Sequence, residues 1–327
     1  MRKLAFYAWL YVESELRKTK NRILNLIDPP VVVLAYHRVS VPQIDFHSLV
    51  VSPENFRAQM EFLKRNFHLV RFEEDWAAAK KPAVAVTFDD GYADNVLALA
   101  IVEEVGVPVT FFISTGNIDS SNEFWWDELE RLVLGEASYP PHFQLNDAKY
   151  GKTWSTETYR ERRRMYWDLH QSAKKITVVR RTGWLRQIRE WAGLNEVTDG
   201  ANRSLTHDEL MILAKSQWVT IGAHTISHPT LSSLTEEEQR HEVVSSKRQL
   251  EKLTGREITV FSYPFGAKRD YDLTTSRICR EAGFNKAAAA FPGEAHRWGD
   301  PYQIPRHAIP NWDVDTFAAK LKGLWIR

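Results

Sequence analysis

The fold of this chain is decided by the stretch PAVAVTFDDGY, residues 82–92. Its first half is short, apolar and rich in Val and Ala, which is typical of a buried β-strand. Two adjacent carboxylates, Asp89 and Asp90, follow directly. Parallel α/β folds carry their chemistry at the carboxyl ends of their strands. The stretch therefore predicts a strand that delivers two acidic side chains to such an edge.

Two further strand-like runs end in polar loops. Residues 216–222 lead into His224 and His228, two imidazoles four positions apart, and residues 259–263 lead into a Pro-Phe-Gly turn. Two imidazoles at this spacing can bind one metal ion, and one Asp with two His leaves open the coordination positions that a hydrolytic site needs. Either cluster alone is equally consistent with a polar turn or a structural pair of histidines. Their shared position after strands favours a metal site.

Helix and strand patterns alternate around these loops. Residues 92–105 predict a helix, and the turn after it leads into an apolar strand at residues 109–113. Residues 235–238, with the sequence TEEE, predict the start of a long amphipathic helix that ends at Gly255. This alternation indicates an α/β fold with a parallel sheet or barrel.

The motifs together resemble the NodB-type polysaccharide deacetylases of carbohydrate esterase family 4. The resemblance rests on TFDDG at residues 87–91, HTISH at residues 224–228 and YPFG at residues 263–266, and it covers roughly residues 31–310 with one insertion. It implies a distorted (β/α) barrel of the NodB homology type with fewer than eight regular units.

The resemblance also implies the roles of the central residues. Asp89 is expected to be the general base, and Asp90, His224 and His228 are expected to bind one divalent metal ion. Zinc suits this set of ligands, although cobalt, nickel and manganese suit it as well. Tyr263, Pro264 and Phe265 are expected to form the oxyanion and substrate segment through a backbone N–H near Phe265.

The general acid departs from the commonest family pattern. Most members carry it in a Leu-x-His motif near the carboxyl terminus, and this sequence has no clear copy. An apolar strand at residues 31–36 instead delivers His37, as in a permuted subgroup that resembles poly-N-acetylglucosamine deacetylases. We therefore predict His37 as the acid and His307 as its rival, while a purely structural role for His37 stays open.

Two other groups of residues are candidates for the site. Many members use an Arg ahead of the Tyr-Pro segment to orient the base, and none precedes Tyr263 here. Arg306 is the candidate replacement from another loop, although a surface Arg is the ordinary alternative. Trp125 and Trp126, shortly after a predicted strand end, are candidates for lining the sugar groove.

Between about residues 120 and 205 the helix–strand alternation lapses. This segment predicts a basic, Trp-rich helical insertion. Aromatic residues beside cations are consistent with a solvated structural face, with contacts to sugars or lipid headgroups, or with binding to nucleic acid. The formal net charge of the whole chain is only +1, which speaks against nucleic acid as the main partner.

The length of 327 residues, of which 43% are hydrophobic, fits one large domain. We expect this domain at residues 31–327, after an amphipathic helix at residues 1–30. The single cysteine, Cys279, excludes an intramolecular disulfide, and we expect it to pack inside a helix.

The amino-terminal segment suggests where the protein acts. Aromatic residues lie beside cations there, which suits peripheral membrane association through residues 1–28, and packing against the barrel is the alternative. The apolar run is short, and no clear signal-peptide cleavage site follows it. We therefore expect a cytoplasmic protein, with membrane association if this helix binds lipid.

The predicted activity is removal of N-acetyl groups from amino sugars in a polysaccharide or a lipid-linked glycan, as a step in surface-polysaccharide synthesis. A deformylase, an esterase or a hydrolase of cyclic amides would use the same site. A non-catalytic carbohydrate-binding protein is the alternative from a different class.

Overall fold

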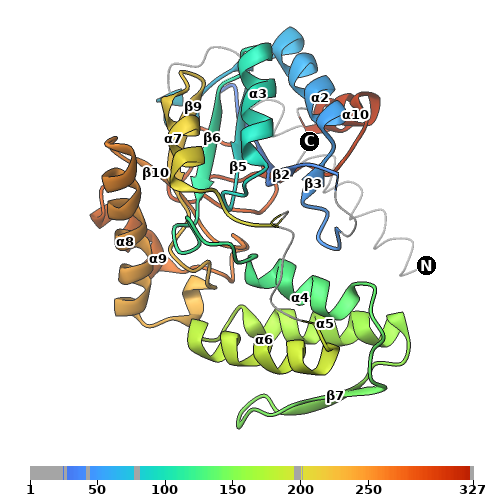
Figure 1. Cartoon of the computed structure of the whole chain (residues 1–327). Coiled ribbons are helices and arrows are strands. Elements are labelled where there is room, and N and C mark those ends of the chain that lie inside the picture. The colour runs from blue at the N-terminus through green and yellow to red at the C-terminus, as the bar shows by residue number, and fades with distance from the viewer. Residues whose placement is uncertain are drawn as a thin grey trace, which may run out of the picture.

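The computed structural model describes residues 28–41, 45–76, 82–194 and 202–324, together with residues 25 and 200. Its centre is a curled eight-stranded sheet in which every strand pair is parallel (Figure 1). The strand order is β11-β10-β9-β6-β5-β1-β12, and β4 pairs with β5. The strands are β1 (Val31–Tyr36), β4 (His68–Leu69), β5 (Ala83–Phe88), β6 (Val109–Ile113), β9 (Val219–Ala223), β10 (Val260–Ser262), β11 (Lys286–Ala288) and β12 (His307–Ala308). The predicted parallel α/β fold is thus confirmed.

The register of the sheet brings the sequence motifs to one edge. Every residue of β1 and β5 is buried, as expected for strands that are covered on both faces. Tyr36 pairs with Phe88, so His37 and Asp89 leave neighbouring strands at the same level. Ile113 pairs with Ala223, which places His224 at this edge too. Strand pairing alone therefore gathers loops that are far apart in the sequence.

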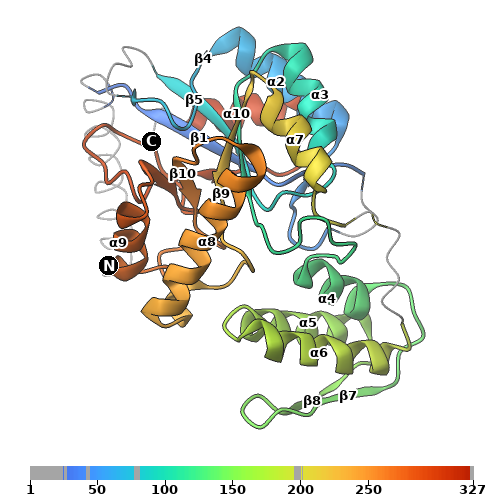
Figure 2. The ribbon, with the colours of Figure 1, turned by 60° about the vertical axis from the view of Figure 1, so that its left-hand side comes forward.

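Helices of the main body pack around this sheet (Figure 2). Their starts and ends follow the capping residues: the Ser52 side chain caps α2, Thr235 and Glu238 form a capping box at the start of α8, and Gly255 ends α8 in the left-handed conformation. The helix predicted at residues 92–105 begins only at Asn95, because residues 89–94 form the turn after β5. The body helices are α2 (Pro53–Asn66), α3 (Asn95–Val105), α7 (His207–Lys215), η2 (Leu231–Ser233), α8 (Glu236–Thr254), α9 (Leu273–Glu281) and α10 (Val314–Leu324). The short strands β2 (Arg38–Val39) and β3 (Val50–Val51) pair beside them.

The segment predicted as a helical insertion forms a separate layer opposite the carboxyl ends of the strands (Figures 1 and 2). It contains α4 (Trp125–Leu134), α5 (Tyr159–Ala173) and α6 (Val178–Ala192) around its own hydrophobic core. It is not purely helical, because β7 (His142–Leu145) and β8 (Lys152–Ser155) form an antiparallel hairpin. Trp154 and Trp184 are buried in this core, so these two Trp residues serve packing.

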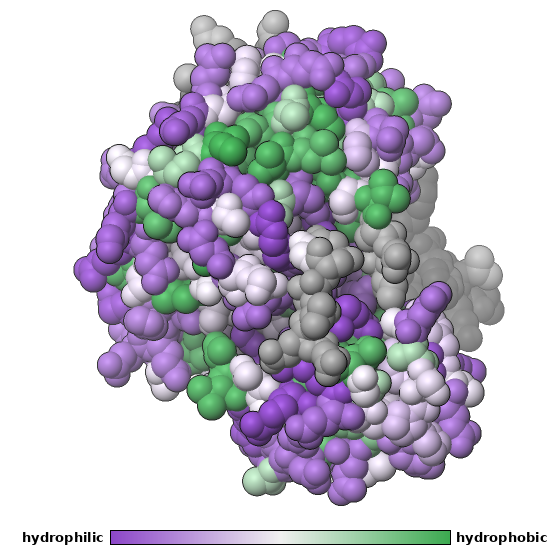
Figure 3. Space-filling view, in the orientation of Figure 1, coloured by the Kyte–Doolittle hydropathy of each residue, from purple (hydrophilic) through white to green (hydrophobic). Residues whose placement is uncertain are grey.

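The amino-terminal helix predicted at residues 1–30, and with it the membrane contact through residues 1–28, falls outside the described residues except for residues 25 and 28–30. Among the described helices, none has the length and apolar character needed to span a bilayer. Cys279 is buried in α9, as predicted. The face shown in Figure 3 is mostly hydrophilic, with a hydrophobic patch over α3 and α7, the helices that expose Leu97 and Ile212.

Candidate active site

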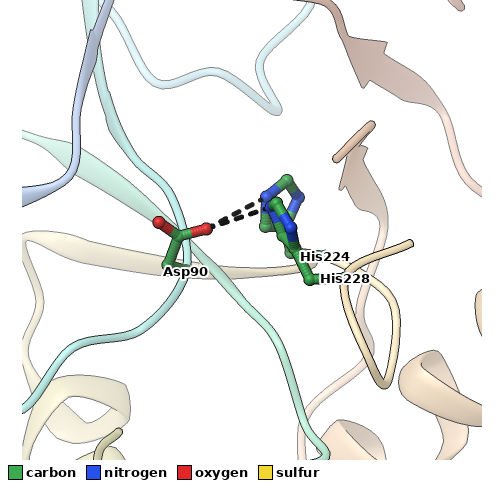
Figure 4. A group of neighbouring side chains, drawn as sticks. All are labelled: Asp90, His224 and His228. Atoms are coloured by element: carbon green, nitrogen blue, oxygen red, sulfur yellow. Dashed lines mark ion pairs between the residues drawn. The ribbon is translucent and has the colours of Figure 1, made fainter. Parts of the chain in front are cut away.

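Asp90, His224 and His228 meet at the carboxyl edge of the sheet (Figure 4). Each offers one ligand atom, and these atoms lie within 4.8 Å of one another. The Nε2 atoms of His224 and His228 lie 3.5 and 3.3 Å from Asp90 Oδ1, and all three side chains are buried. This carboxylate oxygen has no hydrogen-bond donor among the described residues. A buried acceptor facing two imidazoles fits a divalent metal ion of the zinc class.

The surroundings of His224 orient it for coordination. Its Nδ1 lies 2.7 Å from the carbonyl oxygen of Ser262, which terminates β10. An Nδ1–H that donates to this carbonyl leaves the lone pair on Nε2, toward Asp90. The end of β10 thus fixes the tautomer of His224, a predicted metal ligand.

Burial and neighbouring charges shift the pKa values of this cluster. Burial raises the pKa of Asp90, but the His224 and His228 imidazoles outweigh burial and hold the pKa well below its usual value. Burial lowers the pKa of His228 to about 4, although Asp90 acts in the opposite direction. A neutral His228 beside an ionised Asp90 is the protonation state that metal binding requires.

The backbone is strained at several of these positions. Asp90, Thr225, His228 and Phe265 all have positive φ angles, between 53° and 76°. A positive φ angle raises the conformational free energy of a non-glycine residue by about 1–3 kcal/mol, and such residues are concentrated at functional sites. Packing must therefore hold these loops in place, which is expected where side chains have to converge on one ion.

Asp89 is held by Arg306, the candidate from another loop. The guanidinium of Arg306 donates from Nη1 to Asp89 Oδ1 at 2.8 Å and from Nη2 to Oδ2 at 2.6 Å. Arg306 is itself fixed by the Ala289 carbonyl and by the hydroxyls of Thr87 and Ser262. Burial raises the pKa of Asp89, but Arg306 outweighs this effect and lowers the pKa below its usual value. Asp89 is therefore an ionised carboxylate in a fixed orientation.

Arg306→Met should destabilise the protein by about 3–5 kcal/mol, because it leaves the Asp89 carboxylate buried and unpaired. The free energy of unfolding in urea measures this loss. In an Asp89→Asn background the same Arg306 substitution should cost clearly less, because the charge that needs a partner is gone. Equal costs in both backgrounds would show that Arg306 acts through packing alone.

A cavity of about 220 Å³ opens over Asp90, His224 and His228, the candidate metal site. Asp89, Asp90, His224 and His228 line it, and so does His37 at the end of β1. The structure thus brings the predicted acid, base and metal ligands into one chamber. The main-chain carbonyl of His37 accepts a hydrogen bond from Asn95, which fixes the backbone that carries the imidazole.

The other predicted site residues divide between the cavity and its surroundings. Phe265 and Trp126 line the cavity, and the Trp126 ring packs on His228 with 4.5 Å between ring centroids. Trp125 is absent from this lining and faces a neighbouring cavity. The Tyr263 hydroxyl instead points into the core and donates to the Tyr302 carbonyl. Of the predicted oxyanion and substrate segment, Tyr263 and Pro264 are thus absent from the lining, and Phe265 is the member that lines the cavity.

His307 also faces away from the cavity. It lies on β12 between Arg306 and Ala308, which both line the cavity, and alternation along a strand turns His307 to the other side. Its Nε2 lies 2.9 Å from the Gly293 carbonyl oxygen. This position favours His37 as the acid.

Two further histidines in the cavity wall were not identified from the sequence. His47 precedes β3, and His170 lies on α5 of the insertion, with 4.6 Å between their ring centroids. Burial lowers their pKa values to about 4 and about 3, so both are neutral near pH 7. Isolated histidines in polar segments carry no local signal that distinguishes them.

Comparison with known proteins identifies the same family that the sequence motifs resemble. The family model described as "Polysaccharide deacetylase" matches residues 77–179 and 188–287. YxkH of Bacillus subtilis (strain 168), whose name assigns it to the polysaccharide deacetylases, is 26% identical over 126 residues, or 38% of this chain and 44% of YxkH. The matched segment thus spans less than half of that relative.

Solved structures share the fold. The polysaccharide deacetylase BC0361 from Bacillus cereus has a TM-score of 0.59 at 20% identity, covering 92% of this chain and 70% of its own. IcaB from Ammonifex degensii has a TM-score of 0.55 at 17% identity, covering 91% of this chain and 97% of its own. At these low sequence identities, the similarity shows a shared fold.

Proposed function

Because this chain belongs to the polysaccharide deacetylase family, we propose that it is a metal-dependent hydrolase that removes N-acetyl groups from amino sugars of a glycan. The observation that carries the proposal is the shared cavity, which gathers an ionised Asp89 fixed by Arg306, the Asp90–His224–His228 cluster and His37. These groups supply a base, a metal site and an acid, the set that amide hydrolysis needs.

Asp90, His224 and His228 would hold the metal, with zinc as the best fit to this ligand set. When bound, such an ion polarises the amide carbonyl and makes water more acidic. Asp89 accepts a proton from the attacking water on a carboxylate oxygen, while Arg306 keeps that carboxylate ionised and oriented.

Phe265 would stabilise the oxyanion. Its φ angle is +60°, and Gly266 N–H donates to the Pro264 carbonyl at 2.7 Å across a tight turn. No hydrogen bond among the described residues uses the Phe265 N–H, so it is free to donate to a developing negative oxygen. His37 donates a proton to the departing amine nitrogen, and the products are acetate and a free amino sugar.

The direct test is product analysis with N-acetylated chito-oligosaccharides and their N-formylated counterparts. We expect acetate release to exceed formate release, with one free amine formed for each acetate. Preferential formate release would identify a deformylase. If neither product forms although metal is bound, the protein is a carbohydrate-binding member of the family.

A further inference from the structure

A second cavity, of about 570 Å³, adjoins the metal cavity. It lies between the insertion and the loop that carries the metal ligands. Trp126 and His228 line both cavities, so the two share a wall. A chemical group bound in the second cavity would therefore lie beside the reacting amide.

The second cavity contains a buried cation. Arg181, on the first turns of α6, is only 5% exposed. Its Nη2 donates to the Ser227 carbonyl at 3.1 Å, and its guanidinium lies 4.9 Å from the centroid of a Trp125 ring. Its Nη1 is buried and has no hydrogen-bond partner among the described residues. No carboxylate of the described residues forms an ion pair with Arg181 within 4.0 Å.

The carboxylates that line this cavity already have partners. The contacts are Glu123 with Arg131 at 2.8 Å, Glu128 with Arg189, and Glu242 with the backbone N–H groups of Ile226 and Ser227 at 2.8 and 2.9 Å and the Ser227 hydroxyl at 2.6 Å. Arg189 is thus neutralised, whereas Arg181 is a cation without a contacting anion.

A second buried donor lies in the same cavity wall. Trp125 Nε1 has no acceptor among the described residues either. The cavity is also lined by Val178 and Thr182, so it faces the amino-terminal turns of α6, where the helix dipole favours negative charge. Buried donors without acceptors are rare in folded proteins, and they indicate a missing partner that carries oxygen acceptors.

The electrostatics of Arg181 are consistent with such a partner. Burial lowers the pKa of Arg181 to about 10, although Glu242 acts in the opposite direction. The neighbouring groups therefore do not compensate for the hydration that the buried guanidinium has lost. An anion in contact with the guanidinium would compensate for it.

We propose that this second cavity is a subsite for an oxyanion, a phosphate or a carboxylate, which receives hydrogen bonds from Arg181 and Trp125. That the oxyanion is carried by the glycan substrate rests on the proposed function. The substrate would then be an anionic amino-sugar glycan, with its negative group next to the N-acetyl group that is removed.

Binding of inorganic phosphate to the full, metal-free chain tests the subsite, because phosphate then has no metal to bind. Titration calorimetry should show binding to the wild type and at least about tenfold weaker binding to Arg181→Met, the loss expected for a charge-assisted hydrogen bond. Arg181→Lys should lie between them. Arg186→Met is the matched control, because Arg186 is exposed on the same helix and does not line the cavity.

Equal phosphate affinity in Arg181→Met and the wild type would overturn the subsite, and so would a wild type that does not bind millimolar phosphate. Melting temperatures of the variants show whether a loss reflects unfolding. Because Arg181→Lys retains the charge and most of the packing, it supplies the comparison if Arg181→Met does not fold.

The source of the oxyanion is tested by acetate release from three probes: N-acetylglucosamine 1-phosphate, an N-acetylglucosaminyl-glucuronate disaccharide and neutral diacetylchitobiose. We expect kcat/KM to be at least about tenfold higher on one charged probe, and the advantage to persist in Arg186→Met and disappear in Arg181→Met. The preferred probe distinguishes phosphate from carboxylate. A wild type that prefers the neutral probe would contradict an anionic substrate. Arg181-dependent phosphate binding without acetate release from any probe would support the subsite and contradict the proposed function.

Discussion

Asp89→Asn should lower kcat by about 10³-fold or more while the metal content stays unchanged. The substitution removes the proton acceptor and keeps the shape of the side chain, and a general base contributes about 10²–10⁴-fold to the rate. Metal binding should persist, because Asp90, His224 and His228 are untouched. Single-turnover kinetics and elemental analysis of the same preparation measure both quantities.

Asp90→Asn is the matched comparison for Asp89→Asn. It alters the neighbouring carboxylate, which faces both imidazoles, and should remove metal and activity together. Loss of metal in Asp89→Asn would contradict the division of labour between the two carboxylates. Residual activity close to that of the wild type would exclude Asp89 as the base.

His37→Ala should lower kcat on an amide substrate by about 10²–10⁴-fold, the usual contribution of a general acid. The effect should be much smaller on 4-nitrophenyl acetate, because nitrophenolate leaves without a proton. The ratio of the two rates therefore reports on protonation of the leaving group and separates this role from a loss of folding.

His307→Ala is the control for His37→Ala. His307 lies on the neighbouring strand but contacts Gly293 outside the cavity, so its removal should leave the amide-to-ester ratio unchanged. If the amide-to-ester ratio falls in His307→Ala and not in His37→Ala, His307 is the general acid and His37 is not.

The sequence predicted the parts of the site that depend on local pattern. A buried apolar strand followed by charged residues identifies a strand end, and parallel pairing then collects such ends at one edge. These strand patterns predicted Asp89, Asp90 and His224 at one edge of the sheet, and the structure has them there. The family resemblance made Arg306 a candidate for orienting the base, because no Arg precedes Tyr263, and the structure shows Arg306 in contact with Asp89.

The insertion contains features that local sequence patterns do not predict. His170 reaches the cavity only because the core of the insertion docks α5 over the strand ends, and no spacing within α5 signals this contact. The β7–β8 hairpin was missed although Phe143 and Leu145 alternate with exposed residues, because each strand is only four residues long. The position of the Tyr263 ring was also beyond the motif: the motif marks the loop after β10, and the structure shows that the Tyr263 hydroxyl donates to the Tyr302 carbonyl in the core.

The most direct test of the account is the metal content of the purified protein, measured by elemental analysis beside His228→Ala. We expect about one transition-metal ion per wild-type chain, because three buried ligands converge on one point, and loss of that ion in His228→Ala. Acetate release should fall with the metal in the variant and return to the wild type when a chelated sample is reloaded with zinc. A wild-type chain that stays empty after reconstitution, or that releases acetate equally well without metal, would contradict the metal-dependent mechanism.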